Sequence, residues 1–349
     1  MPLGFGIVGC GLIARFHAQA ISELPGAKLV AVQSRNVKNA ANLANGVPGC
    51  TPYVDLQVML QRPDLDVVCI CTPSGAHLEP AEAAAAARKH VVVEKPLEIT
   101  LERCDRLIAT CDHYGVKLCT IFPSRFADAN LALKQAVVAG RFGRLTLAET
   151  ACKWWRTQQY YDEGGWKGTQ TLDGGGAMMN QAIHNIDLLL WLAGPVSRVA
   201  AFTARLAHER IQVEDTAVAV LTFTNGALGV IQAATSVYPG LPKTIALHGD
   251  RGTAVVEQED VLRWDFEPGL PEDQALRQRF VQKVGASGGA SNPAAISHEY
   301  HRRQLADFVE AIQGGRSPAV DGREGRKAVE LILAIYESAA KGRVIELTS

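Results

Sequence analysis

The first third of the chain alternates short, continuously apolar runs with segments of helical periodicity. Continuous apolar runs are typical of strands buried on both faces of a parallel sheet, and the segments between them supply crossover helices. We therefore expect a doubly wound parallel sheet with helices on both faces. The pattern predicts strands at 4–9, 27–33, 66–71, 90–94 and 117–121, and helices at 12–23, 37–45, 76–88 and 100–113.

After about residue 124 the pattern changes to strand-like runs separated by turn signals such as Thr224-Asn225-Gly226. Such runs are typical of an antiparallel sheet. The stretch 285–292, rich in Gly, Ser and Ala, predicts a mobile loop, with a lid as one interpretation. The pattern predicts strands at 145–152, 199–206, 216–224, 227–236, 244–248 and 253–258, and helices at 127–139, 176–192, 298–313 and 323–341.

Composition excludes several classes of partner. The 35 basic residues are scattered and are balanced by 36 acidic ones, so we expect no nucleic-acid partner. No run approaches the roughly twenty apolar residues of a membrane helix, so we expect no membrane partner. The apolar N-terminus lacks a cationic region and is broken by glycines, so we interpret it as a strand rather than a signal peptide. A cytoplasmic protein is expected.

The eight cysteines show no zinc-binding spacing. Cys69 and Cys71 flank Ile70 inside a predicted buried strand, where small apolar thiols pack well. We expect reduced core thiols and no metal site.

The segment 5–14 runs from an apolar strand into a Gly-x-Gly-x-x-Ala turn and then into a helix. Gly9 permits the tight turn, Gly11 lets the backbone approach a pyrophosphate, and Ala14 allows close packing of helix on strand. We expect Leu12 and Ile13, in the first helical turn, to join this dinucleotide site. A glycine-rich structural turn is the alternative.

The end of the second strand bears on the choice of cofactor. An NAD enzyme usually carries an acidic residue there for the ribose hydroxyls, whereas this chain reads Gln33-Ser34-Arg35. Ser34 and Arg35 suit a 2′-phosphate, so we favour NADP over NAD. NAD stays open, because an arginine can also stack on adenine.

Lys95 follows the apolar strand 91–93, at the edge of the sheet where ligands bind in open α/β folds. Next to a nicotinamide, its ammonium would stabilise a developing alkoxide. A solvated strand cap is the structural alternative.

A second polar cluster follows three consecutive glycines at 174–176. Helical spacing places Asn180, His184 and Asp187 on one face. The ordinary pKa of histidine lies near the working pH of an enzyme, so His184 is a candidate general base. A structural histidine with a nearby acceptor is the alternative.

Aromatic and basic residues are concentrated between 153 and 167. Trp155, Tyr160 and Trp166 could pack against a sugar ring, and Arg156 could hold a carboxylate or phosphate. Filling of an interface between domains or subunits explains the same residues equally well.

Taken in order, these motifs resemble the Gfo/Idh/MocA family of nicotinamide-dependent sugar oxidoreductases, over essentially the whole chain. They are the glycine turn, Cys71-Thr72-Pro73-x-x-x-His77, Glu94-Lys95-Pro96 and the glycine triplet followed by His184-x-x-Asp187.

The resemblance implies an α/β fold. A Rossmann domain at 1–123 would precede a substrate-binding and oligomerisation domain at 124–349 with an open-faced, mainly antiparallel sheet. The helices at 298–341 are candidates to pack back towards the first domain. The resemblance further implies catalysis by Lys95, next to a cis proline at Pro96, and by His184. The cofactor contacts it implies are Thr72, Pro73, His77, Glu94, Lys95 and Pro96.

Expected substrates are a sugar, sugar acid, nucleotide sugar or related polyol, acted on by a homodimer or homotetramer formed through the open sheet face. Many family members carry Asp where this chain has Asn180. An amide cannot take a proton, so Asn180 is expected to orient the substrate or His184, which alone would accept the hydroxyl proton. A non-catalytic sugar or nucleotide sensor and a nicotinamide-retaining glycoside hydrolase are the rival functions.

Overall fold

A computed structural model describes residues 2–163, 165–280 and 297–347, so the expected loop at 285–292 lies outside the described residues. The chain divides into two compact units. Unit 1 comprises Met1–Pro123, Thr171–Gly174 and Ser297–Val329, and unit 2 comprises Ser124–Gln170, Gly175–Ile296 and Glu330–Ser349. The expected boundary between two domains, at residues 123 and 124, stays a prediction.

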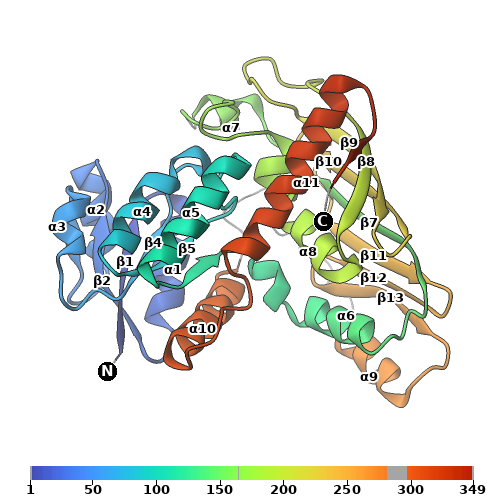
Figure 1. Ribbon diagram of the computed structural model, residues 1–349, viewed down its shortest axis with the longest axis horizontal. Helices are drawn as coiled ribbons and strands as arrows, with labels where there is room; N and C mark the ends of the chain where they lie inside the picture. The colour runs from blue at the N-terminus through green and yellow to red at the C-terminus, as the bar shows by residue number, and fades with distance from the viewer. Residues whose placement is uncertain (1, 164, 281–296, 348–349) are drawn as a thin grey trace. The chain divides into compact units, whose positions relative to one another are not determined.

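Unit 1 is built on a six-stranded sheet in the order β3-β2-β1-β4-β5-β6, in which all pairs are parallel (Figure 1). Because the order reverses between β1 and β4, the loops after these two strands diverge to opposite faces. The expected doubly wound sheet is confirmed. Its strands are β1 (Leu3–Val8), β2 (Ala27–Gln33), β3 (Thr51–Tyr53), β4 (Val67–Ile70), β5 (His90–Val93) and β6 (Leu118–Thr120).

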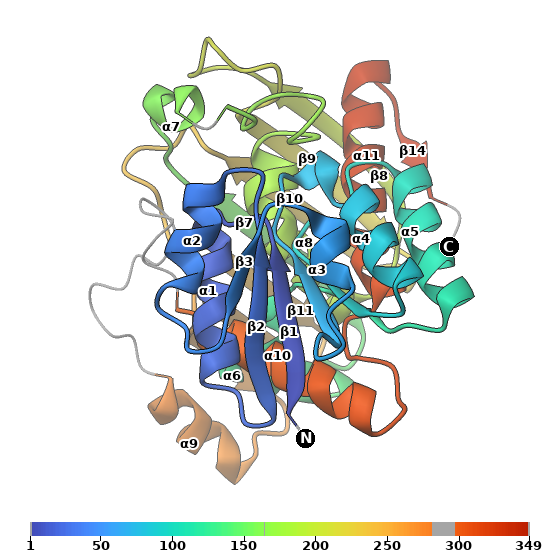
Figure 2. The ribbon, with the colours of Figure 1, turned by 90° about the vertical axis from the view of Figure 1, so that its left-hand side faces the viewer.

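Helices cover both faces of this sheet (Figure 2). On one face, Ile7, Val32 and Cys69 of the strands form a buried cluster with Ile21 of α1 and Phe308 of α10. The opposite face lies against α3 and α4, and α5 packs on α4. The helices are α1 (Leu12–Ser22), α2 (Val37–Ala44), α3 (Leu56–Leu60), α4 (Leu78–Ala86), α5 (Leu101–Tyr114) and α10 (Glu299–Gln313).

Unit 2 contains an eight-stranded sheet in the order β13-β12-β11-β7-β10-β9-β8-β14. All its pairs are antiparallel except β7 with β10, which confirms an expected mainly antiparallel sheet. The strands are β7 (Leu145–Lys153), β8 (Val196–Ala204), β9 (Thr216–Phe223), β10 (Leu228–Ala234), β11 (Thr244–Gly249), β12 (Gly252–Glu257), β13 (Asp260–Phe266) and β14 (Ile345–Glu346).

One face of this second sheet is covered and the other is open. A helix that begins with a π-helical turn, Ala177–Ala182, and continues as α8 (Ile183–Ala193) packs on β7, β10 and β11. On the open face, Phe202, Val220 and Leu228 are 79%, 57% and 59% exposed. The remaining helices are α6 (Asp128–Val138), α7 (Gln158–Asp162), α9 (Pro271–Arg279) and α11 (Gly322–Lys341), the last of which is divided between the two units.

The short elements β3, α3, α7 and β14 and the longer β13 and α9 were not expected. Short segments carry too few residues to show a period, and α9 is strongly polar. Among the described residues, no helix has the length and hydropathy that crossing a bilayer requires.

Candidate functional site

Four of the predicted binding segments of unit 1 lie at one edge of the parallel sheet. Gly9 follows β1, Ser34 follows β2, Thr72 follows β4, and Glu94 and Lys95 follow β5. Since parallel strands present their carboxyl ends at the same edge, the topology brings these segments together at the point where the strand order reverses.

The glycine turn has the backbone that a dinucleotide site needs. Gly9 has a φ of +91°, and a Cβ there would lie 2.7 Å from the carbonyl oxygen of Cys71. A Cβ on Gly11 would meet nothing within 4 Å, so the chain can be approached closely there. The α1 helix has no side-chain cap and no acidic residue in its first turn, which suits a phosphate group. Leu12 is 52% exposed and Ile13 is half-buried.

At the end of β2, some side chains make hydrogen bonds within the protein and others are exposed to solvent. Gln33 is buried and donates to the Val54 carbonyl at 2.6 Å. The Ser34 hydroxyl accepts from the Asn36 backbone at 3.2 Å, and Asn36 caps α2. Arg35 is exposed, so its guanidinium can reach a ligand.

His77 joins two of the predicted cofactor segments. Its Nδ1 lies 2.9 Å from the carbonyl of Pro96 and its Nε2 lies 3.0 Å from that of Thr72. Burial lowers the pKa of His77, with the Glu98 carboxylate opposing that shift. Because the ring is almost completely buried among backbone groups, His77 orders these loops. The contact of His77 with the cofactor stays a prediction. The Lys95–Pro96 bond is cis, as the resemblance implied.

Two histidines that were not predicted as site residues, His17 and His301, lie next to Glu94. Its Oε1 lies 2.8 Å from His17 Nε2, on α1, and 3.6 Å from His301 Nε2, on α10. All three residues are buried. A metal-bound histidine nearly always donates its second N–H to a partner, whereas the Nδ1 atoms of His17 and His301 have none among the described residues. The geometry therefore fits shared protons better than a metal ion.

In unit 2, Asn180 lies on the π-helical turn and His184 on α8. Both are half-buried, whereas most of their neighbours in the helix are buried. Asp187, the third residue expected on this face, forms a buried ion pair with Arg125, whose nitrogens lie 2.8 and 2.6 Å from the carboxylate oxygens. Asp187 is therefore a structural residue of this helix.

The start of the helix that carries Asn180 and His184 is held by Glu214, which was not predicted. Its carboxylate accepts from the backbone N–H groups of Gly176 and Met178 at 2.8 and 2.9 Å and from the Tyr336 hydroxyl at 2.9 Å. Burial raises the pKa of Glu214, and these donors oppose that rise. A Cβ on Gly176 would overlap the Glu214 carbonyl, so the last glycine of the triplet is required here.

The aromatic and basic segment lies next to the same helix. Arg156 is 3% exposed, with its guanidinium 2.8 Å from the Trp155 carbonyl and 3.2 Å from Gln181 Oε1. Gln181 Nε2 in turn lies 3.3 Å from the Tyr160 hydroxyl and 3.2 Å from Asn180 Oδ1. The structure thus links Arg156 and Tyr160 to Asn180, while Trp155 and Trp166 are half-buried nearby in the sequence.

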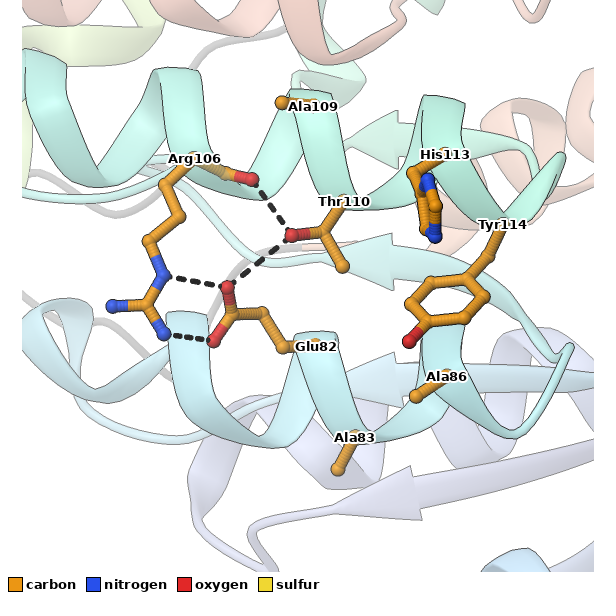
Figure 3. A pocket seen from close by; sticks show the side chains of 8 residues that line it. All are labelled: Glu82, Ala83, Ala86, Arg106, Ala109, Thr110, His113 and Tyr114. Atoms are coloured by element: carbon orange, nitrogen blue, oxygen red, sulfur yellow. Dashed lines mark hydrogen bonds and ion pairs between the residues drawn. The ribbon is translucent and has the colours of Figure 1, made fainter.

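Two surface grooves lie away from the predicted residues. The larger, of about 600 Å³, runs between α4 and α5, and the ion pair of Glu82 with Arg106 closes one end (Figure 3). Tyr114 and His113 lie at the other end. The second, of about 510 Å³, is lined by residues of the hairpins around Gly249 and Phe266.

Comparison with known proteins points to one family. The model described as "Oxidoreductase family, NAD-binding Rossmann fold" matches residues 3–122, and the "GFO/IDH/MocA C-terminal domain" matches residues 130–255. Myo-inositol 2-dehydrogenase of Thermotoga maritima is 27% identical and covers 98% of both chains. The WlbA dehydrogenase from Bordetella pertussis, solved with NADH and UDP-GlcNAcA, is 35% identical over 100% of this chain and 98% of its own, with a TM-score of 0.89.

Proposed function

Since the chain belongs to the Gfo/Idh/MocA family of NAD-binding oxidoreductases, we propose that it oxidises a secondary hydroxyl, or reduces the matching ketone, of a sugar, sugar acid, nucleotide sugar or related polyol. The observation that supports this most directly is the position of Lys95. It lies at the same sheet edge as the glycine turn.

We propose separate roles for the two catalytic residues. His184 accepts the proton of the substrate hydroxyl, because a neutral imidazole is a base near neutral pH. Lys95 donates a hydrogen bond to the same oxygen and stabilises its negative charge. Asn180 and Tyr160, linked through Gln181, orient the substrate. When bound, the nicotinamide ring supplies hydride-transfer chemistry.

We propose that the pyrophosphate binds at the uncapped start of α1, around Gly11, and that NADP is preferred over NAD. Arg35 is exposed at the end of β2, and no acidic residue occupies the usual ribose position. An Arg35→Ala variant should bind NADPH about tenfold or more weakly and NADH within about twofold of wild type, because only NADPH loses a charged hydrogen bond. Lys38→Ala, at a nearby exposed site, is the control. An equal loss for both nucleotides would indicate stacking on adenine.

The substrate class follows from the relatives and the local chemistry. WlbA was solved with a nucleotide-linked sugar acid, and the relatives act on polyols and anhydrosugars, as the names myo-inositol 2-dehydrogenase and levoglucosan dehydrogenase state. We infer a pyranose-type polyol or sugar acid, with a nucleotide-linked hexuronate as the leading candidate. The basic and aromatic surroundings of Arg156 support an acidic ring.

The first test follows the near-ultraviolet absorbance of reduced nicotinamide. Purified protein is offered free, acidic and nucleotide-linked sugars with NADP and with NAD. Reduction of either nucleotide by a sugar, lost in Lys95→Met, supports the proposal. Tight nucleotide binding with no reduction contradicts it, and a hydrolysis assay then separates the sensor from the glycoside hydrolase.

We also propose a cytoplasmic homodimer or homotetramer that forms through the open face of the second sheet. Phe202 pairs with Val218 and Ala200 with Val220 across neighbouring strands, so their side chains form one exposed apolar surface. Light scattering should report a larger species for wild type and a monomer for Phe202→Lys. A wild-type monomer would remove this proposal.

A further inference from the structure

Glu94 and two histidines, His17 and His301, form a buried polar cluster in the core of unit 1. One carboxylate oxygen lies 2.8 Å from His17 Nε2 and 3.6 Å from His301 Nε2, and the imidazole rings meet edge to face with centroids 5.5 Å apart. The other oxygen accepts from the backbone N–H of Lys95 at 3.2 Å. The carboxylate therefore connects two helices to the backbone of the proposed catalytic lysine.

The positions of the protons follow from the partners. A carboxylate oxygen can only accept, so His17, at 2.8 Å, must carry its proton on Nε2. His301 Nε2 faces the same oxygen at 3.6 Å, longer than a hydrogen bond, and a proton on this nitrogen is the arrangement that favours the carboxylate. The Nδ1 atoms of His17 and His301 are buried and have no hydrogen-bond partner among the described residues. Protonation there would leave a buried N–H without an acceptor, so the neutral Nε2–H form fits both rings.

Electrostatics agrees with an ionised Glu94. Burial raises its pKa, but the interactions with His17 and His301 together outweigh burial and hold the pKa well below its ordinary value. Burial raises the pKa of the nearby thiols, so they remain neutral, and it lowers the pKa of His77 and His301. The titratable groups that face Glu94 are His17, Cys69, Cys71, His77, Cys119 and His301.

We propose that His17 and His301 are positioning residues: together they hold Glu94 as an anion, and Glu94 fixes the Lys95 backbone in the orientation that catalysis requires. This inference rests on the proposed role of Lys95. It assigns part of the catalytic geometry to α10, which is distant from Lys95 in sequence.

The first experiment locates the ring protons directly. Protein with 15N-labelled histidine is examined by two-bond 1H–15N correlation, with His17→Gln and His301→Gln used to assign the two signals. Both rings should show the neutral Nε2–H form near neutral pH. A neutral Nδ1–H form at either ring overturns the proposal, as does a metal-bound shift that disappears on chelation.

The second experiment separates positioning from folding. His17→Leu and His301→Leu should lower kcat about tenfold at about pH 6, with NADPH affinity and thermal stability close to those of the Gln variants, which keep a donor. Without the two histidines the pKa of Glu94 rises, so the loss should shrink as the pH is raised from about 6 to about 8.5, because higher pH favours the ionised carboxylate. A loss that does not depend on pH would mean a structural role and contradict the proposal.

Two controls distinguish failure of this inference from failure of the proposed function. His298→Gln alters a half-buried histidine just before α10, paired with Glu23, and should change neither kcat nor its pH profile. Lys95→Met is assayed in parallel. If it retains turnover, the role of Lys95 falls. If only Lys95→Met is inactive while the His17 and His301 variants match wild type, the function stands and the positioning role falls.

Discussion

The two units hold their proposed catalytic side chains in different ways. In unit 1, Lys95 follows a buried strand, and its backbone N–H donates to Glu94, which accepts from His17 and lies 3.6 Å from His301. In unit 2, His184 lies on a helix whose first turn is π-helical, and Glu214 binds that turn through backbone N–H groups. Glu94 therefore has histidine side chains as its main partners, whereas Glu214 binds two backbone N–H groups and the Tyr336 hydroxyl.

The two carboxylates differ accordingly in their titration. Two imidazoles hold the pKa of Glu94 well below its ordinary value, whereas burial of Glu214 outweighs its donors and raises the pKa. Burial alone therefore does not determine the charge of a carboxyl group. The type of group that accompanies burial decides it: imidazoles lie beside Glu94, and neutral N–H and hydroxyl donors beside Glu214.

The largest expected effect is at Lys95. Lys95→Met should lower kcat by at least about a hundredfold, because the ammonium that stabilises the alkoxide is lost, while nucleotide affinity stays nearly intact. Steady-state rates and NADPH fluorescence titration measure the two quantities. Lys38→Met, at an exposed position, is the control. Undiminished turnover would mean that unit 1 contributes only cofactor binding.

His184→Ala tests the corresponding residue of unit 2. Loss of the base should lower kcat by about a hundredfold, and the remaining rate should rise with hydroxide concentration, because the solvent must then accept the proton. The pH dependence of kcat measures this. His113→Gln, at an exposed site on α5, is the control and should keep the wild-type profile. A wild-type rate in His184→Ala would remove the general-base role.

A smaller effect is expected where the π-helical turn meets Glu214. Glu214→Ala leaves buried N–H groups of Gly176 and Met178 without acceptors, which should lower the free energy of unfolding by about 2 kcal/mol. Urea denaturation measures the change. Glu209→Ala removes an exposed carboxylate nearby in the chain and should have little effect. Equal stability of the two variants would show that the cap is dispensable.

The smallest effect distinguishes the two carboxylates by pH. A lowered pKa stabilises the fold above about pH 4 and that stability is lost in acid, so Glu94→Gln should be most destabilising near neutral pH. A raised pKa acts in the opposite sense, so Glu214→Gln should be most destabilising below about pH 4. Urea unfolding at several pH values should give slopes of opposite sign, with differences of about 1 kcal/mol. Parallel slopes would contradict the comparison.

Much of unit 1 could be predicted from the sequence because its signals are local. Buried parallel strands are continuous apolar runs, and Gly9 and Gly11 lie in a turn that specifies its own backbone. His17 was recoverable in principle, because helical spacing places it near Ala14, Ala18 and Ile21, on the buried face of α1.

The remaining features depend on residues distant in sequence. Nothing near His301 indicates that it meets Glu94, and nothing near Glu214 indicates that it binds the turn after the glycine triplet. Helical spacing alone grouped Asp187 with His184, whereas Arg125 binds Asp187 in the core. A charged side chain pairs with the partner that tertiary structure supplies, which local periodicity cannot identify.

The place of α10 in unit 1 has a consequence for synthesis of the chain. The apolar face formed by Ala14 and Ile21 is completed by Leu305 and Phe308, which are translated only after the strands of unit 2 through β13. After the strands of the parallel sheet have been synthesised, the nascent chain therefore keeps this apolar surface uncovered while unit 2 is being translated. Only the packing of α10 then buries that surface.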